Sequence, residues 1–104
     1  MTIATGGRGK PVYGTELKVP ARKTVTTAGT AEQLTATAEN ISGLYISALS
    51  TNTGNVYIGG SDVDSTNGYI LANTDTHLFI PIGDPSLLYL DVATSGEGVA
   101  YWCF

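Results

Sequence analysis

The chain has 104 residues, of which 42% are hydrophobic and only 13% carry a charge. This length indicates a single domain with one core. The charged fraction lies well below the usual quarter, so the surface is expected to consist largely of Ser, Thr, Asn and Gly. The single cysteine, Cys103, excludes an internal disulfide, and its place in a terminal apolar run predicts a buried side chain.

Charge is distributed unevenly along the chain. All five basic residues lie within the first 23 positions, where Glu16 is the only acid. From Thr24 onward there are eight acids and no Lys or Arg. The sequence therefore predicts a basic arm attached to an acidic body.

The first residues differ from the rest in their backbone preferences. Gly and Pro recur through residues 1–22 and forbid a regular helix there. We interpret residues 1–22 as an extended arm that becomes ordered on a partner, with an unattached terminus as the alternative. No stretch reads as a signal peptide or membrane span, so we expect a soluble protein made in a cytoplasm, with no membrane partner.

Residues 43–60 show the clearest strand pattern. Apolar residues alternate over 44–48, a Gly- and Asn-bearing loop follows, and a β-branched and aromatic run resumes at 56–58. This pattern predicts a β-hairpin. Similar runs predict further strands at 23–27, 32–38, 68–71, 76–80, 86–92 and 98–104.

About eight short strands with turn signals every ~8 to 12 residues indicate an all-β fold. We expect residues 23–104 to form an antiparallel β-sandwich or a jelly-roll-like barrel. The last strand reaches Phe104, so the end of the chain should lie inside a sheet.

The residues that carry chemistry do not assemble into a catalytic set. His77 is the only histidine and has no Ser, Cys or paired carboxylate beside it in sequence, so we expect no enzymatic activity and no cofactor. Asp62, Asp64 and Asn67 offer oxygen atoms in one loop but lack the EF-hand spacing. We interpret this loop as a turn capped by its own side chains and leave calcium as an alternative.

Two further binding chemistries involve nucleic acid and sugar. A nucleic-acid partner is not expected, because the acidic body would repel a phosphate backbone. Aromatic side chains in the strands suit a sugar-stacking platform, although such residues more often fill a core edge or a subunit interface. The residues concerned are Tyr45, Tyr57, Tyr69, Tyr89, Tyr101 and Trp102 in the predicted strands, together with Tyr13.

The run LSTNTGNVYIGGS at 49–61, with NGYIL at 67–71 and LFIP at 78–81, resembles a β-sandwich module of small virion proteins of tailed bacteriophages. The resemblance is to capsid decoration, or cement, proteins and head-fibre domains, and it covers residues 23–104. It implies a jelly-roll-like sandwich, often a homotrimer, that sits on the capsid exterior of the virion and fastens adjacent major capsid proteins.

The arm lies outside the resembling run, so its role follows from its charge. We expect its basic residues and one tyrosine to form the capsid contact, namely Arg8, Lys10, Tyr13, Lys18, Arg22 and Lys23. The alternative function is a receptor- or glycan-binding domain of a phage fibre or tail.

Overall fold

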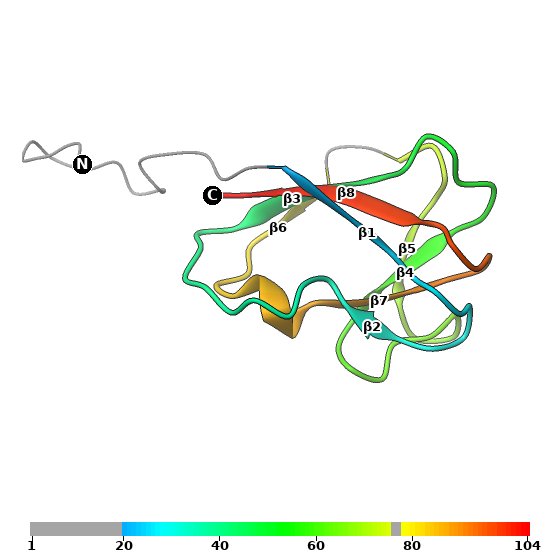
Figure 1. The fold of residues 1–104 in the computed structure, drawn as a ribbon, viewed down its shortest axis with the longest axis horizontal. Helices are drawn as coiled ribbons and strands as arrows, with labels where there is room; N and C mark the ends of the chain where they lie inside the picture. Colours follow the sequence, from blue (N-terminus) through cyan, green and yellow to red (C-terminus); the bar gives the residue numbers. More distant parts are fainter. Residues whose placement is uncertain (1–19, 76–77) are drawn as a thin grey trace, which may run out of the picture.

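The structure is a computed structural model that describes residues 20–75 and 78–104. These residues contain eight β-strands and one short 3-10 helix. Figure 1 labels the strands along the chain. The elements are β1 (Ala21–Thr24), β2 (Glu32–Gln33), β3 (Leu44–Ala48), β4 (Val56–Gly59), β5 (Tyr69–Leu71), β6 (Leu78–Ile80), η1 (Pro85–Leu87), β7 (Tyr89–Val92) and β8 (Gly98–Cys103). The expected all-β fold is confirmed. In the part of the chain that the structure describes, no helix is long and apolar enough to cross a membrane.

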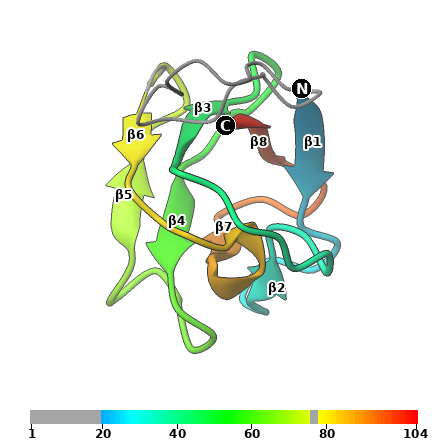
Figure 2. The ribbon, with the colours of Figure 1, turned by 90° about the vertical axis from the view of Figure 1, so that its left-hand side faces the viewer.

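The eight strands form two antiparallel sheets of four strands each. One sheet has the order β1-β8-β3-β6 and the other the order β2-β7-β4-β5. Figure 2 shows them as two layers, with β6, β3, β8 and β1 above β5, β4, β7 and β2. The domain is therefore an antiparallel β-sandwich.

The pairing between strands is nested. β1 pairs with β8, β2 with β7, β3 with β6, and β4 with β5. Ladders between β3 and β8 and between β4 and β7 then complete the two sheets. An eight-stranded double sheet wound in this way has the strand order of a jelly roll.

The predicted hairpin over residues 43–60 is wrong. β3 lies in the first sheet and β4 in the second, so the segment between them crosses from one layer to the other. Among the described strands, only β4 and β5 are consecutive and paired. Period-two alternation indicates which side chains face the core, but it does not identify the neighbouring strand.

Some strands are shorter than the sequence predicted, in one case where a side chain forms hydrogen bonds with the backbone. The segment 86–92 was expected to be one strand, yet it starts within η1 and only Tyr89–Val92 pairs. Asp84 caps η1 because its Oδ1 accepts hydrogen bonds from the Ser86 nitrogen at 2.9 Å and from Ser86 Oγ at 2.8 Å. These bonds from Ser86 hold the pKa of Asp84 below its usual value. The segment 32–38 likewise contributes only the two residues of β2.

Inward-facing residues of both sheets form the core. The most deeply buried apolar side chains are Val25, Leu44, Ile46, Val56, Leu71, Leu90 and Val99. Cys103 is also buried, as the sequence predicted. β8 lies between β1 and β3, so the end of the chain is held within a sheet, as expected (Figure 1).

Candidate functional site

Two of the six residues predicted to contact a capsid lie in the described structure. Arg22 and Lys23 belong to β1, where they pair with Ala100 and Val99 of β8. Arg8, Lys10, Tyr13 and Lys18 lie outside the described residues. Residue 22 was assigned to the arm, but in the structure β1 already begins at Ala21.

Arg22 and Lys23 point to opposite sides of their strand, as consecutive strand residues do. Lys23 Nζ lies 2.7 Å from Glu32 Oε1, and Glu32 belongs to β2 of the other sheet. The hydrogen bond from Lys23, with a further one from the Thr26 nitrogen, lowers the pKa of Glu32. Lys23 therefore joins the two sheets at their edges, whereas Arg22 is exposed on the outer face.

An aromatic row crosses the outer side of the first sheet. Tyr45 of β3 is opposite Phe79 of β6 on one side and Trp102 of β8 on the other. These three side chains keep between 40% and 44% of their surface exposed. Phe104 continues the row, with its ring 5.7 Å from that of Tyr45 and 6.0 Å from that of Phe79. We call Tyr45, Phe79, Trp102 and Phe104 the aromatic face.

The backbone beneath the aromatic face fixes these rings. A side chain at Gly43 would place its Cβ only 2.7 Å from Cζ of Phe79, so the glycine lets this ring lie close over the strand. Gly43 and Phe104 exchange backbone hydrogen bonds of 3.0 and 3.2 Å, which extend the ladder between β3 and β8. Tyr45 and Phe79 are 5.3 Å apart at an angle of 59°, a favourable tilted geometry. The aromatic face is thus preformed.

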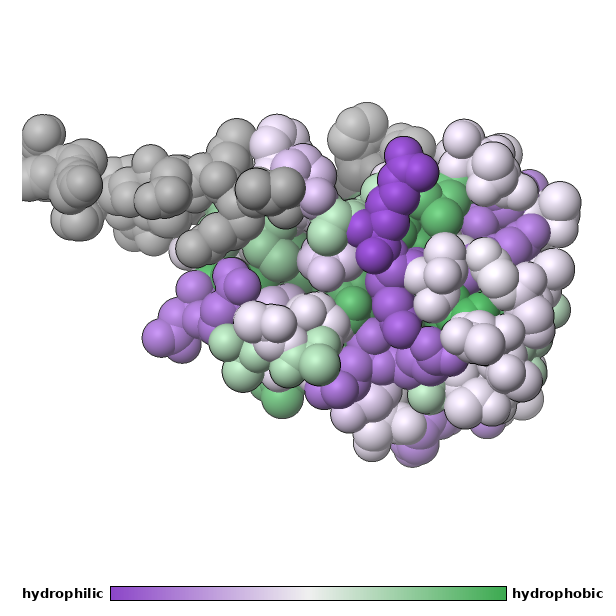
Figure 3. All heavy atoms as spheres, in the orientation of Figure 1, coloured by the Kyte–Doolittle hydropathy of each residue, from purple (hydrophilic) through white to green (hydrophobic). Residues whose placement is uncertain are grey.

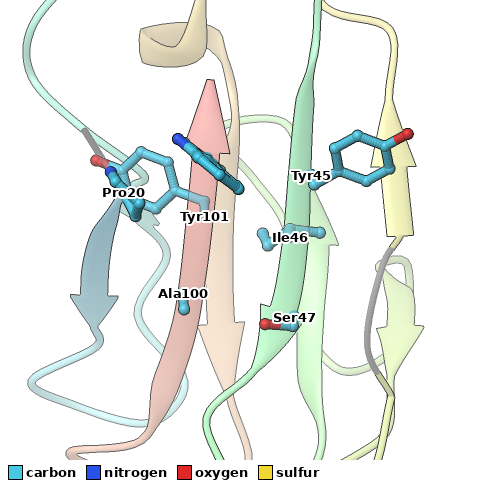
Figure 4. Close-up of a pocket in the computed structure, with 7 residues that line it drawn as sticks. Pro20, Tyr45, Ile46, Ser47, Ala100 and Tyr101 are labelled. Atoms are coloured by element: carbon cyan, nitrogen blue, oxygen red, sulfur yellow. The ribbon is translucent and has the colours of Figure 1, made fainter. Parts of the chain in front are cut away.

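A hollow of about 290 Å³ lies beside the aromatic face. Its lining residues are Pro20, Tyr45, Ile46, Ser47, Ala100, Tyr101 and Trp102. Figure 4 shows Pro20 just before β1, Tyr45, Ile46 and Ser47 on β3, and Ala100 and Tyr101 on β8. Ser47 and Ala100 are paired across β3 and β8, and their small side chains leave the space between larger neighbours. The hollow is open to a ligand or to a side chain of a partner.

The sheet that carries the aromatic face has no acidic residue in its four described strands. The eight acids of the body lie in the other sheet or in the loops, at Glu32, Glu39, Asp62, Asp64, Asp75, Asp84, Asp91 and Glu97. One face of the molecule is seen in Figure 3, where pale residues of intermediate hydropathy lie beside a band of hydrophilic residues. None of these acids therefore lies in a strand of the sheet that carries the aromatic face.

The loop considered for calcium uses its oxygen atoms internally. Asp64 Oδ1 accepts hydrogen bonds from the Thr66 nitrogen and hydroxyl, and Asn67 bonds to Asp62 and Asp64. The hydrogen bonds from Thr66 lower the pKa of Asp64. The interpretation as a self-capped turn is confirmed. Over residues 20–75 and 78–104 no group of three or more His, Cys, Asp or Glu could hold a metal, and His77 lies outside the described residues.

The aromatic residues singled out in the sequence do not form one platform. Tyr57 and Tyr89 belong to the second sheet, Tyr69 lies on its edge strand β5, and Tyr101 packs against the core. Burial raises the pKa of the Tyr101 hydroxyl. Only Tyr45 and Trp102 share the outer side of the first sheet. Phe79 and Phe104 were missed as members of this surface, because the register that joins β6, β3 and β8 is not visible in the sequence.

The fold and this surface define a class of protein: an antiparallel β-sandwich with jelly-roll strand order and an exposed, preformed aromatic face on one sheet. Comparison with protein-family models, curated proteins and solved structures gives no match for the chain. We therefore infer a function from the geometry, the charge distribution and the resemblance of the sequence.

Proposed function

We propose that this chain is a structural protein of a phage virion, with no enzymatic activity. It binds the outer capsid surface as a homotrimer and stabilises contacts between major capsid proteins. A capsid as the target is supported by the resemblance of residues 49–61, 67–71 and 78–81 to decoration proteins. The jelly-roll strand order agrees with this proposal, because viral capsid domains share it, although lectin domains share it too.

The observation that carries the proposal is the absence of acidic residues from the strands of the sheet that carries the aromatic face. Three of the five basic residues precede Pro20, and a fourth, Arg22, is exposed on the acid-free sheet. A partner with carboxylates is attracted there and meets no like charge in those strands. Nucleic acid is disfavoured, because eight acids of the body would repel an extended phosphate backbone.

Oligomerisation would strengthen a modest contact without new chemistry. Three copies bound to one capsid raise the overall affinity through effective concentration, provided that their geometry allows simultaneous contact. The basic residues Arg8, Lys10, Lys18 and Arg22, together with Tyr13, would supply the arm's part of each contact. Lys23 adds little, since Glu32 already neutralises it.

Co-sedimentation tests this function. Capsids from the phage that encodes the chain, produced without it, are titrated with the full chain and with a chain that begins at Pro20. Saturable binding of the full chain supports decoration, and its loss on removal of residues 1–19 assigns a contact to the arm. If the full chain does not sediment with capsids, the proposal is refuted.

A second candidate function, glycan recognition by a fibre or tail domain, is favoured by one observation. Tyr45 and Trp102 line the hollow with Ser47, an arrangement suited to stacking against a sugar ring. A glycan array separates the two functions. Strong, saturable binding of an oligosaccharide that Trp102→Ala abolishes would favour glycan recognition over decoration.

A further inference from the structure

The outer edge of β1 presents backbone groups that the sandwich does not use. β1 is the outermost strand of its sheet, with β8 as its neighbour (Figure 2). The residues of β8 opposite Arg22 and Thr24 are Ala100 and Gly98. The Gly98 carbonyl accepts from the Leu49 nitrogen at 3.1 Å, on the side of β8 that faces β3. Because the directions of backbone groups alternate along a strand, those of Ala100, two residues further, also point to β3.

Arg22 and Thr24 therefore direct their own N–H and C=O groups away from β8. Among residues 20–75 and 78–104, no hydrogen bond engages these groups. The next outward-directed N–H, that of Thr26, is bonded to Glu32 Oε2 at 3.0 Å. At the other end, Pro20 has no N–H to donate. We call the outward backbone groups of Arg22 and Thr24 the open edge of β1.

The other edge strands are shorter, and β5 is also closed at both ends by its own loops. On β5, the Gly68 nitrogen donates to the Asp64 carbonyl at 3.0 Å, and the Ala72 nitrogen donates to Asp75 Oδ2 at 2.8 Å. β2 and β6 consist of two and three residues. Natural proteins protect exposed strand edges, because an unprotected edge pairs with other chains. The open edge of β1 is therefore the place where a strand from elsewhere can add to this sandwich.

The side chains of β1 define the strand that fits. Arg22 and Thr24 are exposed on the outer face, whereas Ala21 and Lys23 are half-buried. In the part of the chain that the structure describes, Arg22 forms no ion pair, and the strands of its sheet contain no acid. Opposite charges and pairs of Thr on neighbouring strands stabilise a sheet. A fitting strand therefore places a carboxylate opposite Arg22, a hydroxyl opposite Thr24 and an apolar residue between them.

We infer that the open edge of β1 binds an extended segment of a partner protein, which adds a strand to the first sheet. The segment alternates polar and apolar residues and carries Asp or Glu opposite Arg22. This inference goes beyond the proposed function, because this mode of binding does not require a capsid. A second copy of the chain fits less well. Centring two antiparallel β1 strands on residue 22 or 23 would place two Arg22 or two Lys23 side chains directly opposite each other.

The test is an NMR titration of the full chain, labelled with nitrogen-15, against a synthetic peptide probe. The acetylated and amidated probe Thr-Val-Glu-Val-Thr can place its Glu opposite Arg22 and a Thr opposite Thr24. The amide signals of Arg22 and Thr24 should shift to saturation. At a probe concentration of about ten times Kd, hydrogen exchange of these two amides should slow about 10-fold.

Two matched probes separate backbone pairing from charge. A probe that is N-methylated at Glu and at both Thr residues keeps its side chains but loses the donors to β1, so it should bind at least ~10-fold more weakly. A probe with Lys in place of Glu keeps the donors but sets a like charge opposite Arg22, so it should bind at least ~5-fold more weakly. If the first probe shifts no signal of β1, or if the N-methylated probe binds equally well, the inference is overturned.

Variants of the chain test the same two features. Thr24→Pro removes an N–H that the fold does not use and should weaken binding at least ~10-fold. Ile70→Pro is the matched control, since Ile70 is an outward-directed residue of the edge strand β5, and it should bind within about twofold of the parent. Arg22→Glu should reverse the order of the Glu and Lys probes, and an unchanged order would overturn the stated chemistry of the partner. Circular dichroism and the unfolding midpoint verify that each variant is folded.

Hydrogen exchange without any probe tests the other occupants. The amides of Arg22 and Thr24 should exchange rapidly in the parent chain, because water is their partner there. Slow exchange of both amides would show that the edge is already occupied by this chain or by a second copy, and it would overturn the inference. Sedimentation velocity of the parent and of Thr24→Pro then distinguishes these two occupants, since only pairing between copies gives a smaller species for the variant.

Discussion

Replacing Asn52 by Ala should destabilise the sandwich more than its place in a loop suggests. Asn52 lies between β3 and β4 and is only 6% exposed. Its Nδ2 donates to the Gly98 carbonyl at 2.7 Å, and its Oδ1 accepts from the Gly98 nitrogen at 3.2 Å. One side chain thereby ties the crossing between the sheets to the start of β8.

The expected cost follows from the partners that remain. In Asn52→Ala, the Gly98 carbonyl still accepts from the Leu49 nitrogen at 3.1 Å, but the Gly98 nitrogen loses its acceptor. A buried donor without a partner costs about 1–3 kcal/mol, and the second lost hydrogen bond adds about 1 kcal/mol. We therefore expect the free energy of unfolding to fall by about 2–4 kcal/mol.

Urea denaturation, followed by circular dichroism and by Trp102 fluorescence, measures this change. The slope of the transition should stay constant, so that the midpoint reports stability. Asn67→Ala is the matched control, because Asn67 also makes two hydrogen bonds but is exposed, and water replaces them at a cost below about 1 kcal/mol. Equal losses for the two variants would refute the reasoning.

Three further predictions concern stability. Gly98→Ala should lower the free energy of unfolding by about 1–3 kcal/mol in a denaturant titration, because the new Cβ would meet the backbone of Lys23 and Thr24. Gly60→Ala, with no atom nearer than 3.8 Å, should be close to neutral, and a reversed order would contradict this explanation. Hydrogen bonds from Thr53 and Gly54 lower the pKa of Glu97, so its stabilisation is fully present above the ordinary value of 4.5 and is lost as the pH falls through the lowered value. Thermal unfolding between neutral pH and pH 3 should therefore show a smaller acid loss for Glu97→Gln than for the parent, and identical profiles would exclude this role. Lys23→Met should lower the free energy of unfolding by no more than about 1 kcal/mol, since the side chains of Lys23 and Glu32 are 27% and 24% exposed. High salt should reduce this loss, because salt screens an exposed ion pair more strongly than a buried one.

The sequence was sufficient to predict the class of fold, because a strand produces a local pattern of alternating side chains. Alternation at residues 44–48 places Leu44 and Ile46 in the core and Tyr45 outside, as found. The terminal apolar run placed Cys103 in the interior for the same reason. These predictions need only the two-residue period of a strand.

The sequence could not predict which strands pair with each other in the sheets. The turn-like residues after Ala48 suggested a hairpin, yet the chain there crosses to the other sheet, held by Asn52 at Gly98. Which of Arg22 and Lys23 faces outward depends on the register between β1 and β8. The aromatic face depends on two ladders that join segments distant in sequence, so local pattern could not assemble it.

The nested pairing of strands has a consequence for how the protein folds. Only the innermost pair, β4 and β5, is local among the described strands, and the outermost pair joins Ala21–Thr24 to Gly98–Cys103. Such distant pairing slows folding, typically to milliseconds or seconds, because long loops must close before the contacts form. β8 contributes Trp102 and also supports β3, which carries Tyr45. A nascent chain that lacks β8 therefore has an incomplete aromatic face, so synthesis through β8 precedes any contact that needs the whole face.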